Sequence, residues 1–378
     1  MAGIYLHIPF CKKRCIYCDF YSSTRSDLRT HYVEALCSEL KQRIHYLNGE
    51  PVTTLYLGGG TPSQLTINQL QRIFNCLSQL IELQTLEEIT LEANPDDLTP
   101  TYVEGLASLP INRISMGIQS FDDRMLGLLN RRHTAQQAIQ AVACCREAGF
   151  SNLSIDLMYG LPGQTETSWS KDLQQAIALE VEHISAYHLS IEEGTPLHHL
   201  IQAHRLHETD EELSVRLFEL LTSTLQQAGY EQYEISNFCR PGYHSRHNSS
   251  YWHGIPYLGC GASAHSFNRT SREWNVASIE RYIEGINSNH RDFEQEHLDA
   301  TTRYNETVMT ALRTRQGLDL HLLTQNFGHS SYNYCLRMAR PHLESGLLAL
   351  TNDHLHLTQK GIFVSDHILT DLMKVTDM

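Results

Sequence analysis

Residues 5–22 read "YLHIPFCKKRCIYCDFYS" and place Cys11, Cys15 and Cys18 within eight positions. The apolar, β-rich start predicts a strand that leads directly into the cysteines. Structural zinc closes its tetrahedron with four protein ligands, and no second pair of Cys or His follows at finger-like spacing. Three thiolates suit an iron–sulfur cubane, in which one of the four irons stays open to a substrate or cofactor. Zinc and inert thiols are the alternatives.

Short β-rich runs alternate with helical patterns from residue 3 to about residue 200. The six runs are IYLHI, TTLYLGGG, EEITLEANP, RISMGIQS, LSIDLMYGLP and HISAYHLS. Strands that alternate with helices predict a parallel sheet with right-handed crossovers. Six such strands predict an α/β fold with a partial (β/α)6 barrel rather than the full eight units.

Polar or glycine-rich residues crowd the C-terminal ends of these predicted strands. They are Gly58, Gly59, Gly60, Thr61, Glu92, Asn94, Gln119, Ser120, Asp156, Tyr187 and His188. Ligands of α/β barrels bind at that rim, so the pattern predicts one pocket. The glycine run also lets backbone N–H groups approach a charged ligand closely.

Three parts are expected along the chain. Residues 1–230 are predicted to form the barrel, and residues 231–300 an irregular segment rich in Tyr, Gly and His. Residues 301–378 are predicted to form a small C-terminal α+β module, in which LLAL and LHLT make a hairpin before the last helix. Helices followed by a small hairpin resemble a winged helix.

Composition narrows the class of protein. The 378 residues are 41% hydrophobic and 19% charged, as in ordinary globular chains. No apolar run approaches the ~20 residues that span a bilayer, and no signal peptide is recognisable, so a cytoplasmic protein without a membrane segment is expected. A net charge of −14 disfavours nucleic-acid binding. The ten cysteines indicate reduced thiols or metal ligands.

Several motifs together resemble the oxygen-independent coproporphyrinogen III oxidase family of the radical S-adenosylmethionine (SAM) superfamily. They are YLHIPFCKKRCIYCDF, LYLGGGTP, ITLEANPDDL, ISMGIQSF, LNRRH, IDLMYGLPGQT and AYHLS, and they cover essentially the whole chain. The resemblance implies a radical SAM barrel that holds a [4Fe-4S] cluster and SAM. The iron without a cysteine is the one that the methionine end of SAM chelates in this superfamily.

The resemblance assigns site residues by matching motif. The cluster ligands are Cys11, Cys15 and Cys18, and the SAM contacts are Tyr5, Tyr17, Gly59, Gly60, Thr61, Glu92, Gln119, Arg131, Asp156 and Tyr187. The chemistry is suitable, because Glu92 can accept from an ammonium or a ribose hydroxyl and Arg131 can pair with a carboxylate. Taken singly, Asp156 could instead be a strand-end cap and Arg131 a surface cation.

Two departures separate the chain from the oxidases. The oxidases carry a fourth Cys where this chain has Phe20, and an N-terminal extension before the first strand. In addition, SRHNSSYWHG contains a His-Asn-x-x-Tyr-Trp motif that resembles the haem chaperone branch of the family. An imidazole can ligate haem iron, so His247 is the expected haem ligand, with His244 and His253 as rivals. The alternative is a loop in which aromatic residues pack around a histidine whose ring nitrogens are hydrogen-bonded within the protein.

The expected function is that of a haem-binding chaperone on a radical SAM scaffold, which delivers haem to acceptor proteins. The alternative is oxygen-independent coproporphyrinogen III oxidation, which decarboxylates propionates to vinyl groups. A third hypothesis makes the C-terminal module a regulator with a structural metal. The acceptor proteins are not indicated, and the choice between a monomer and a homodimer stays open.

Overall fold

The stretch before the cysteines forms the first strand of a large sheet. The computed structural model describes residues 1–375. Strands β1 to β6 are parallel and lie side by side in chain order. They are β1 (Ala2–Ile8), β2 (Val52–Gly59), β3 (Glu88–Ala93), β4 (Arg113–Gln119), β5 (Leu153–Tyr159) and β6 (His183–His188). The six predicted strands are confirmed.

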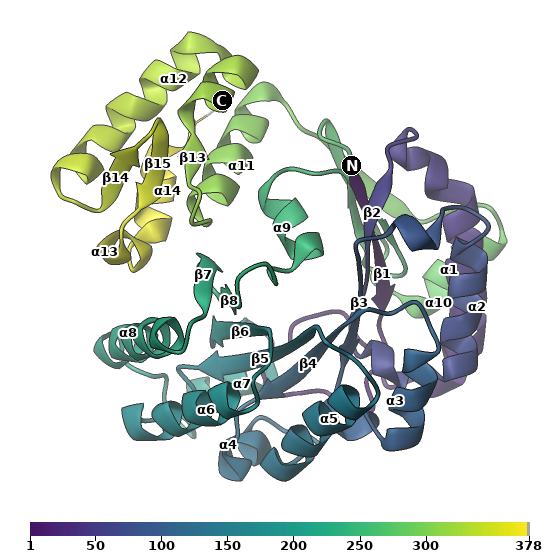
Figure 1. Ribbon diagram of the computed structural model, residues 1–378. Coiled ribbons are helices and arrows are strands. Elements are labelled where there is room, and N and C mark those ends of the chain that lie inside the picture. Colours follow the sequence, from purple (N-terminus) through teal and green to yellow (C-terminus); the bar gives the residue numbers. More distant parts are fainter. Residues whose placement is uncertain (376–378) are drawn as a thin grey trace.

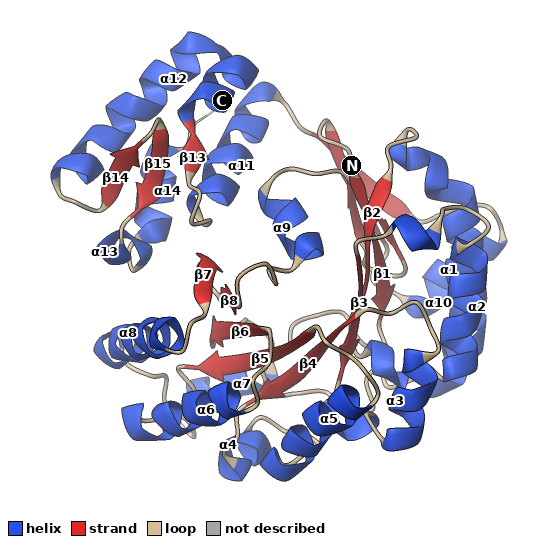
Figure 2. Cartoon of the chain, in the orientation of Figure 1, coloured by secondary structure: helices blue, strands red, loops and turns tan. Residues whose placement is uncertain are grey.

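Helices follow the strands and cover the outer face of the curved sheet (Figure 1). They are α1 (Arg29–Arg43), α2 (Ile67–Leu77), α3 (Pro100–Ala107), α4 (Asp123–Leu128), α5 (Ala135–Glu147), α6 (Glu166–Ala178), α7 (Pro196–Gln202) and α8 (Glu211–Gln227). Capping boxes at Thr66, Thr134 and Thr165 begin α2, α5 and α6. Figure 2 shows the resulting alternation of strand and helix, which is that of a partial (β/α)6 barrel.

Residues 231–300 extend this sheet, whereas an irregular segment was expected there. The segment contains β7 (Glu231–Glu234), β8 (Asn237–Cys239), α9 (Arg246–Trp252), β9 (Tyr257–Cys260), β10 (His265–Phe267), β11 (Ser271–Asn275), α10 (Ile279–Asn287) and β12 (Phe293–His297). Strand β8 pairs antiparallel with β6, and β9 pairs parallel with β1, so both edges of the barrel sheet are prolonged. The strands are three to five residues long, too short to give a clear periodic signal.

A buried ionic network fixes the added strands to the barrel. Arg43 of α1 pairs with Glu39 and Glu273 and donates to the Gly259 carbonyl at 2.8 Å. Glu39 also accepts from the Gly261 N–H at 2.7 Å. The network therefore ties α1 to β9 and β11.

The C-terminal module has a hydrophobic core of its own. It comprises α11 (Ala300–Leu312), β13 (Leu318–Asp319), α12 (Leu320–Glu344, kinked at Gly328), β14 (Leu348–Thr351), β15 (His354–Leu357), α13 (Gln359–Ile362) and α14 (Ser365–Leu372). The predicted hairpin is β14–β15, whose turn places Asn352 and Asp353 at φ of 51° and 60°, as a two-residue hairpin turn requires. The domain boundaries at residues 230 and 300 stay predictions.

Candidate active site at the strand ends

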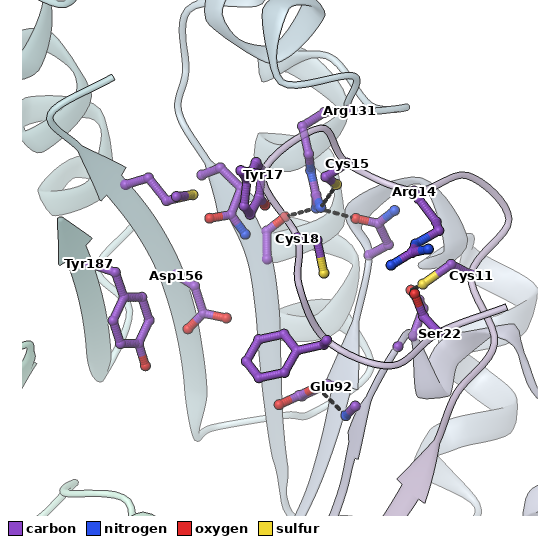
Figure 3. A pocket seen from close by; sticks show the side chains of 18 of the residues that line it. Cys11, Arg14, Cys15, Tyr17, Cys18, Ser22, Glu92, Arg131, Asp156 and Tyr187 are labelled. Carbon is purple, nitrogen blue, oxygen red and sulfur yellow. Dashed lines mark hydrogen bonds between the residues drawn. The ribbon is translucent and has the colours of Figure 1, made fainter. Parts of the chain in front are cut away.

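A cavity of about 600 Å³ brings together nearly all the residues expected to bind cofactors. Those in its lining are Cys11, Cys15, Cys18, Tyr17, Gly59, Gly60, Thr61, Glu92, Gln119, Arg131, Asp156 and Tyr187. Figure 3 shows the cysteine loop on one side of the cavity and the side chains of Glu92, Asp156 and Tyr187 on the other. The residues converge as the strand-end pattern predicts, and their roles as ligands stay predictions.

Backbone hydrogen bonds hold the cysteine loop over the cavity. The Cys11 N–H donates to the Ser23 carbonyl at 2.9 Å, and the Ser23 N–H donates to the Pro9 carbonyl at 2.7 Å, which closes the loop at its base. At the middle of the loop, the Ile16 N–H donates to the Leu129 carbonyl at 3.3 Å. The three thiols are therefore carried by a loop that is anchored at its base and at its tip.

The surroundings of the thiols suit an iron–sulfur cluster. Burial, with the neighbouring thiols of Cys15 and Cys11, raises the pKa of Cys18 to about 11. Arg131 donates to the Cys15 sulfur at 3.2 Å, and Thr61 lies 3.6 Å from the Cys11 sulfur. Within residues 1–375, no three His, Cys, Asp or Glu side chains are arranged to hold one metal ion. Three thiolates around a polynuclear iron–sulfur core would be neutralised by its irons, so this donor set fits the cluster.

Glu92 lies at the end of β3 with both carboxylate oxygens engaged. The Tyr56 hydroxyl donates to Oε1 at 2.7 Å, and the Gly59 N–H donates to Oε2 at 3.1 Å. Burial outweighs these bonds and raises the pKa of Glu92 to about 7. An ammonium or hydroxyl donor from a ligand would favour the ionised carboxylate.

Gln119 and Arg131 are positioned by an irregularity at the end of β4. The register between β4 and β5 shifts between Gly117 and Gln119, and Gln119 adopts a φ of 74°, which is uncommon for a residue other than glycine. Arg131 donates to the Asn94 side chain and to the Gly117 carbonyl. The guanidinium is thereby held against the cysteine loop.

Two expected residues lie outside the cavity lining, Tyr5 and His247. The Tyr5 ring stacks on Tyr56 at 6.1 Å, and its hydroxyl lies 3.1 Å from His7 Nδ1. Tyr5 thus packs on Tyr56, which does line the cavity, and its expected contact with SAM stays a prediction. Asp156 does line the cavity and accepts from Ser115 Oγ at 3.5 Å, and burial raises its pKa.

His247 occupies the first turn of α9 and is 1% exposed. Its Nδ1 lies 2.8 Å from Thr54 Oγ1, its Nε2 lies 2.9 Å from the Tyr251 hydroxyl, and its ring stacks on Tyr56 at 5.1 Å. Burial lowers the pKa of His247 to about 4. Because both ring nitrogens have partners, His247 would have to lose one of them to ligate a haem iron, and its role as haem ligand stays a prediction.

Glu88 holds α9 in this position. Its carboxylate accepts from the N–H groups of Arg246 and His247 at 2.7 and 3.1 Å and from Ser245 Oγ at 3.3 Å. The rival histidines at the two ends of the motif, His244 and His253, are exposed to solvent. The His253 ring is nevertheless bonded at both nitrogens, to the Ser249 carbonyl at 2.7 Å and to Gln316 Oε1 at 3.1 Å.

Comparison with known proteins identifies the family. Residues 5–176 match the Radical SAM superfamily model, and residues 298–364 match the HemN C-terminal domain. The heme chaperone HemW of Bacillus subtilis is 32% identical over 97% of this chain and 98% of its own length. HemW of Mycobacterium tuberculosis strain H37Rv is 34% identical over 98% of this chain and 94% of its own. The chain belongs to the HemW family.

A HemN structure supports the fold of this HemW-family chain. Coproporphyrinogen III oxidase HemN of Escherichia coli, a radical SAM enzyme, has a TM-score of 0.85 at 23% identity, over 99% of this chain and 90% of that one. The radical SAM barrel with a small C-terminal module is thus confirmed as the fold. The radical SAM assignment also implies a [4Fe-4S] cluster and SAM as cofactors.

Sequence reasoning missed several polar residues of this cavity. Among them are Arg113, Ser115, Ser185 and Asn248. The period of two along β4 could have indicated two of them, because residues 113, 115, 117 and 119 share one face of a strand. Asn248 lies in α9, which Figure 1 places on the inner side of the sheet, and no local signal places a helix there.

Proposed function

We propose that this protein binds haem and passes it to acceptor proteins, on a scaffold that holds a [4Fe-4S] cluster and SAM. The observation that carries the proposal is the near full-length similarity to proteins named heme chaperone HemW. The cavity supports the cofactor part, because its lining contains the three cysteines and nine of the ten residues expected at SAM, Tyr5 being the exception. When bound, the cluster supplies an iron without a protein thiolate, to which the methionine end of SAM can bind.

Protein groups on either side of the cavity have separate roles in this proposal. Arg131, held against the Cys15 sulfur, would bind an anionic group of SAM close to the cluster. Glu92 would accept from an ammonium or hydroxyl of SAM. Both groups are held by other side chains or backbone before any ligand arrives, which lowers the cost of ordering them.

Haem is proposed to be held at the ends of α9. His247 could ligate iron only after losing its contacts with Thr54 and Tyr251. His253 would also have to lose a contact, because its Nδ1 bonds to the Ser249 carbonyl at 2.7 Å and its Nε2 lies 3.1 Å from Gln316 Oε1. The His244 ring is exposed and, among residues 1–375, forms no such bond. Arg313 stacks over the Trp252 ring at 5.4 Å beside His253. We therefore place His244 ahead of His253 and His247 as haem ligand.

The proposal is tested by anaerobic haem titration of the reconstituted protein, followed by absorbance. Wild type is compared with His244→Ala, His253→Ala and His247→Ala, and porphyrin products from coproporphyrinogen are assayed in parallel. Stoichiometric haem binding that is weakened by His244→Ala or His253→Ala, without decarboxylated product, supports the chaperone. Product formation with haem binding indifferent to all three substitutions would instead support the oxidase.

The cellular location and the assembly of the protein are also part of the proposal. No helix within residues 1–375 combines the length and apolar character that a membrane span requires. We propose that the protein works in the cytoplasm and reaches acceptor proteins there. Sedimentation of the reconstituted protein with and without haem would test whether a homodimer is involved.

A further inference from the structure

Arg113 is a buried arginine whose charge is not paired. It is the first residue of β4, is 1% exposed and lines the cavity. Among residues 1–375, its Nε and Nη1 are buried without a hydrogen-bond partner. Four carboxylates line the cavity, those of Asp19, Glu92, Asp156 and Glu192, and among residues 1–375 none forms an ion pair with Arg113. Arg113 acts on Glu92 and Asp156 through its charge and favours their ionised forms, while Glu92 accepts from Tyr56 and Asp156 from Ser115.

An unpaired guanidinium in the interior is costly to keep. Arginine stays protonated in proteins, so it cannot lose its charge on burial. A buried charge is normally paired, and one left without a partner destabilises the fold. The chain follows this rule at Arg43, which is 8% exposed and is paired with Glu39 and Glu273. Arg113 is thus the exception that a ligand could explain.

The position of Arg113 separates it from the cluster end of the cavity. Gln119 ends β4 near the cysteine loop, and Arg113 begins the same strand. Six residues of strand correspond to about 20 Å. Ser185 and Asn248 also line the cavity and offer hydrogen-bond donors, whereas the Ser115 hydroxyl donates to Asp156 at 3.5 Å. This part of the cavity therefore combines the fixed positive charge of Arg113 with neutral polar groups and the carboxyl group of Asp156.

We propose that Arg113, with Ser185 and Asn248, forms a second ligand subsite that binds a carboxylate group. The planar guanidinium matches a carboxylate through two parallel N–H···O bonds, and both unpartnered nitrogens would be satisfied. This subsite borders Asp156, which is assigned to SAM, and it does not depend on how haem iron is ligated. The carboxylate can belong to a free short-chain acid or to a propionate arm of a tetrapyrrole.

The contrasting structural role is charge balance. Arg113 could serve only to offset the buried carboxylates Glu92 and Asp156 across the cavity. In that case its removal would destabilise the protein, as removal of the paired Arg43 would. If Arg113 is instead kept for a ligand, replacing it with an apolar side chain of similar length relieves an uncompensated charge. The two roles therefore predict opposite changes in stability.

The first experiment compares thermal midpoints of the reconstituted full chain with cluster and SAM, for wild type, Arg113→Met, Arg113→Lys and the matched control Arg43→Met. We expect Arg113→Met to be as stable as wild type or more stable, and Arg43→Met to be strongly destabilised. Sodium propionate is compared with sodium chloride of equal ionic strength. Propionate should raise the thermal midpoint of wild type and of Arg43→Met. The rise should be smaller in Arg113→Lys and absent in Arg113→Met.

The second experiment distinguishes the sources of the carboxylate. Haem and haem dimethyl ester are titrated into wild type and Arg113→Met. A tenfold or greater loss of affinity for haem in Arg113→Met, with the ester unaffected, assigns the subsite to a tetrapyrrole propionate. If propionate raises the thermal midpoint only when Arg113 is present, and haem and its ester show no such difference, the subsite is assigned to a small acid. The propionate measurement is informative even if the protein binds no haem.

Two results would overturn the proposal. One is that neither propionate nor haem distinguishes wild type from Arg113→Met. The other is that Arg113→Met unfolds or loses as much stability as Arg43→Met, which would make Arg113 a structural charge.

Discussion

The raised pKa of Glu92 predicts a measurable dependence of stability on pH. The side chain is buried at the end of β3, and burial is the largest cause of the shift from 4.5 to about 7. The hydroxyl of Tyr56 and the N–H of Gly59 favour the ionised carboxylate but only partly compensate. Replacing Glu92 with Gln removes the ionisation and leaves the shape of the side chain unchanged.

The sign and size of the change in unfolding free energy with pH follow from proton linkage. Between pH 4.5 and 7 the unfolded chain has lost the Glu92 proton while the folded chain retains it. The folded state therefore binds more protons, and stability falls as pH rises through this window. A pKa raised from 4.5 to about 7 corresponds to about 3 kcal/mol of folding stability. This stability is lost completely only above pH 7.

The assay is urea unfolding of cofactor-free wild type and Glu92→Gln at several values between pH 4.5 and 8. The amide of Glu92→Gln can change the unfolding free energy by an amount that does not depend on pH. This amount cancels, because only the pH dependence of the difference in unfolding free energy between wild type and variant is used. We expect wild type to lose about 3 kcal/mol relative to the variant across this range. A constant difference, or wild type gaining stability with pH, would refute the assignment of a desolvated carboxylate.

Further predictions concern the loop and the buried network. Cys15→Ser should abolish stable cluster incorporation, measured as iron and acid-labile sulfide per chain, while the fold seen by far-UV circular dichroism is retained. Gly60→Ala should lower cluster content, because a Cβ there would lie 2.9 Å from the Pro9 carbonyl carbon at the base of the cysteine loop; an unchanged iron content would contradict this. Arg43→Met should cost about 3 to 5 kcal/mol in urea unfolding, because it leaves Glu39 buried without its cation; a cost below about 1 kcal/mol would show that the network is not needed.

The barrel was predictable from sequence because its signals are local. Each strand from β1 to β6 is a short apolar run followed by a helix with its own periodicity, and the hairpin turn at Asn352 and Asp353 is also local. The strand-end residues could be placed in one pocket for the same reason, since parallel strands end at one edge of the sheet.

The pairing of the later strands was not predictable in this way. Strand β9 has four residues and joins the sheet beside β1, more than 240 residues earlier in the chain. Its place depends on Glu39 and Arg43 of α1, which bind backbone groups of Gly259 and Gly261. Such contacts are set by tertiary packing and leave no periodic pattern in the sequence.

The haem motif shows why a motif alone does not locate a ligand. His247 is joined to the SAM side of the molecule through packing: its ring stacks on Tyr56, and the Tyr56 hydroxyl donates to Glu92. Removing the imidazole therefore disturbs the Glu92 carboxylate as well as α9. Weaker haem binding in His247→Ala would not by itself identify an iron ligand, unless SAM affinity measured on the same sample is unchanged. His244 and His253 lie outside this chain of contacts, so loss of haem binding in their variants with SAM affinity intact is the result that identifies a ligand.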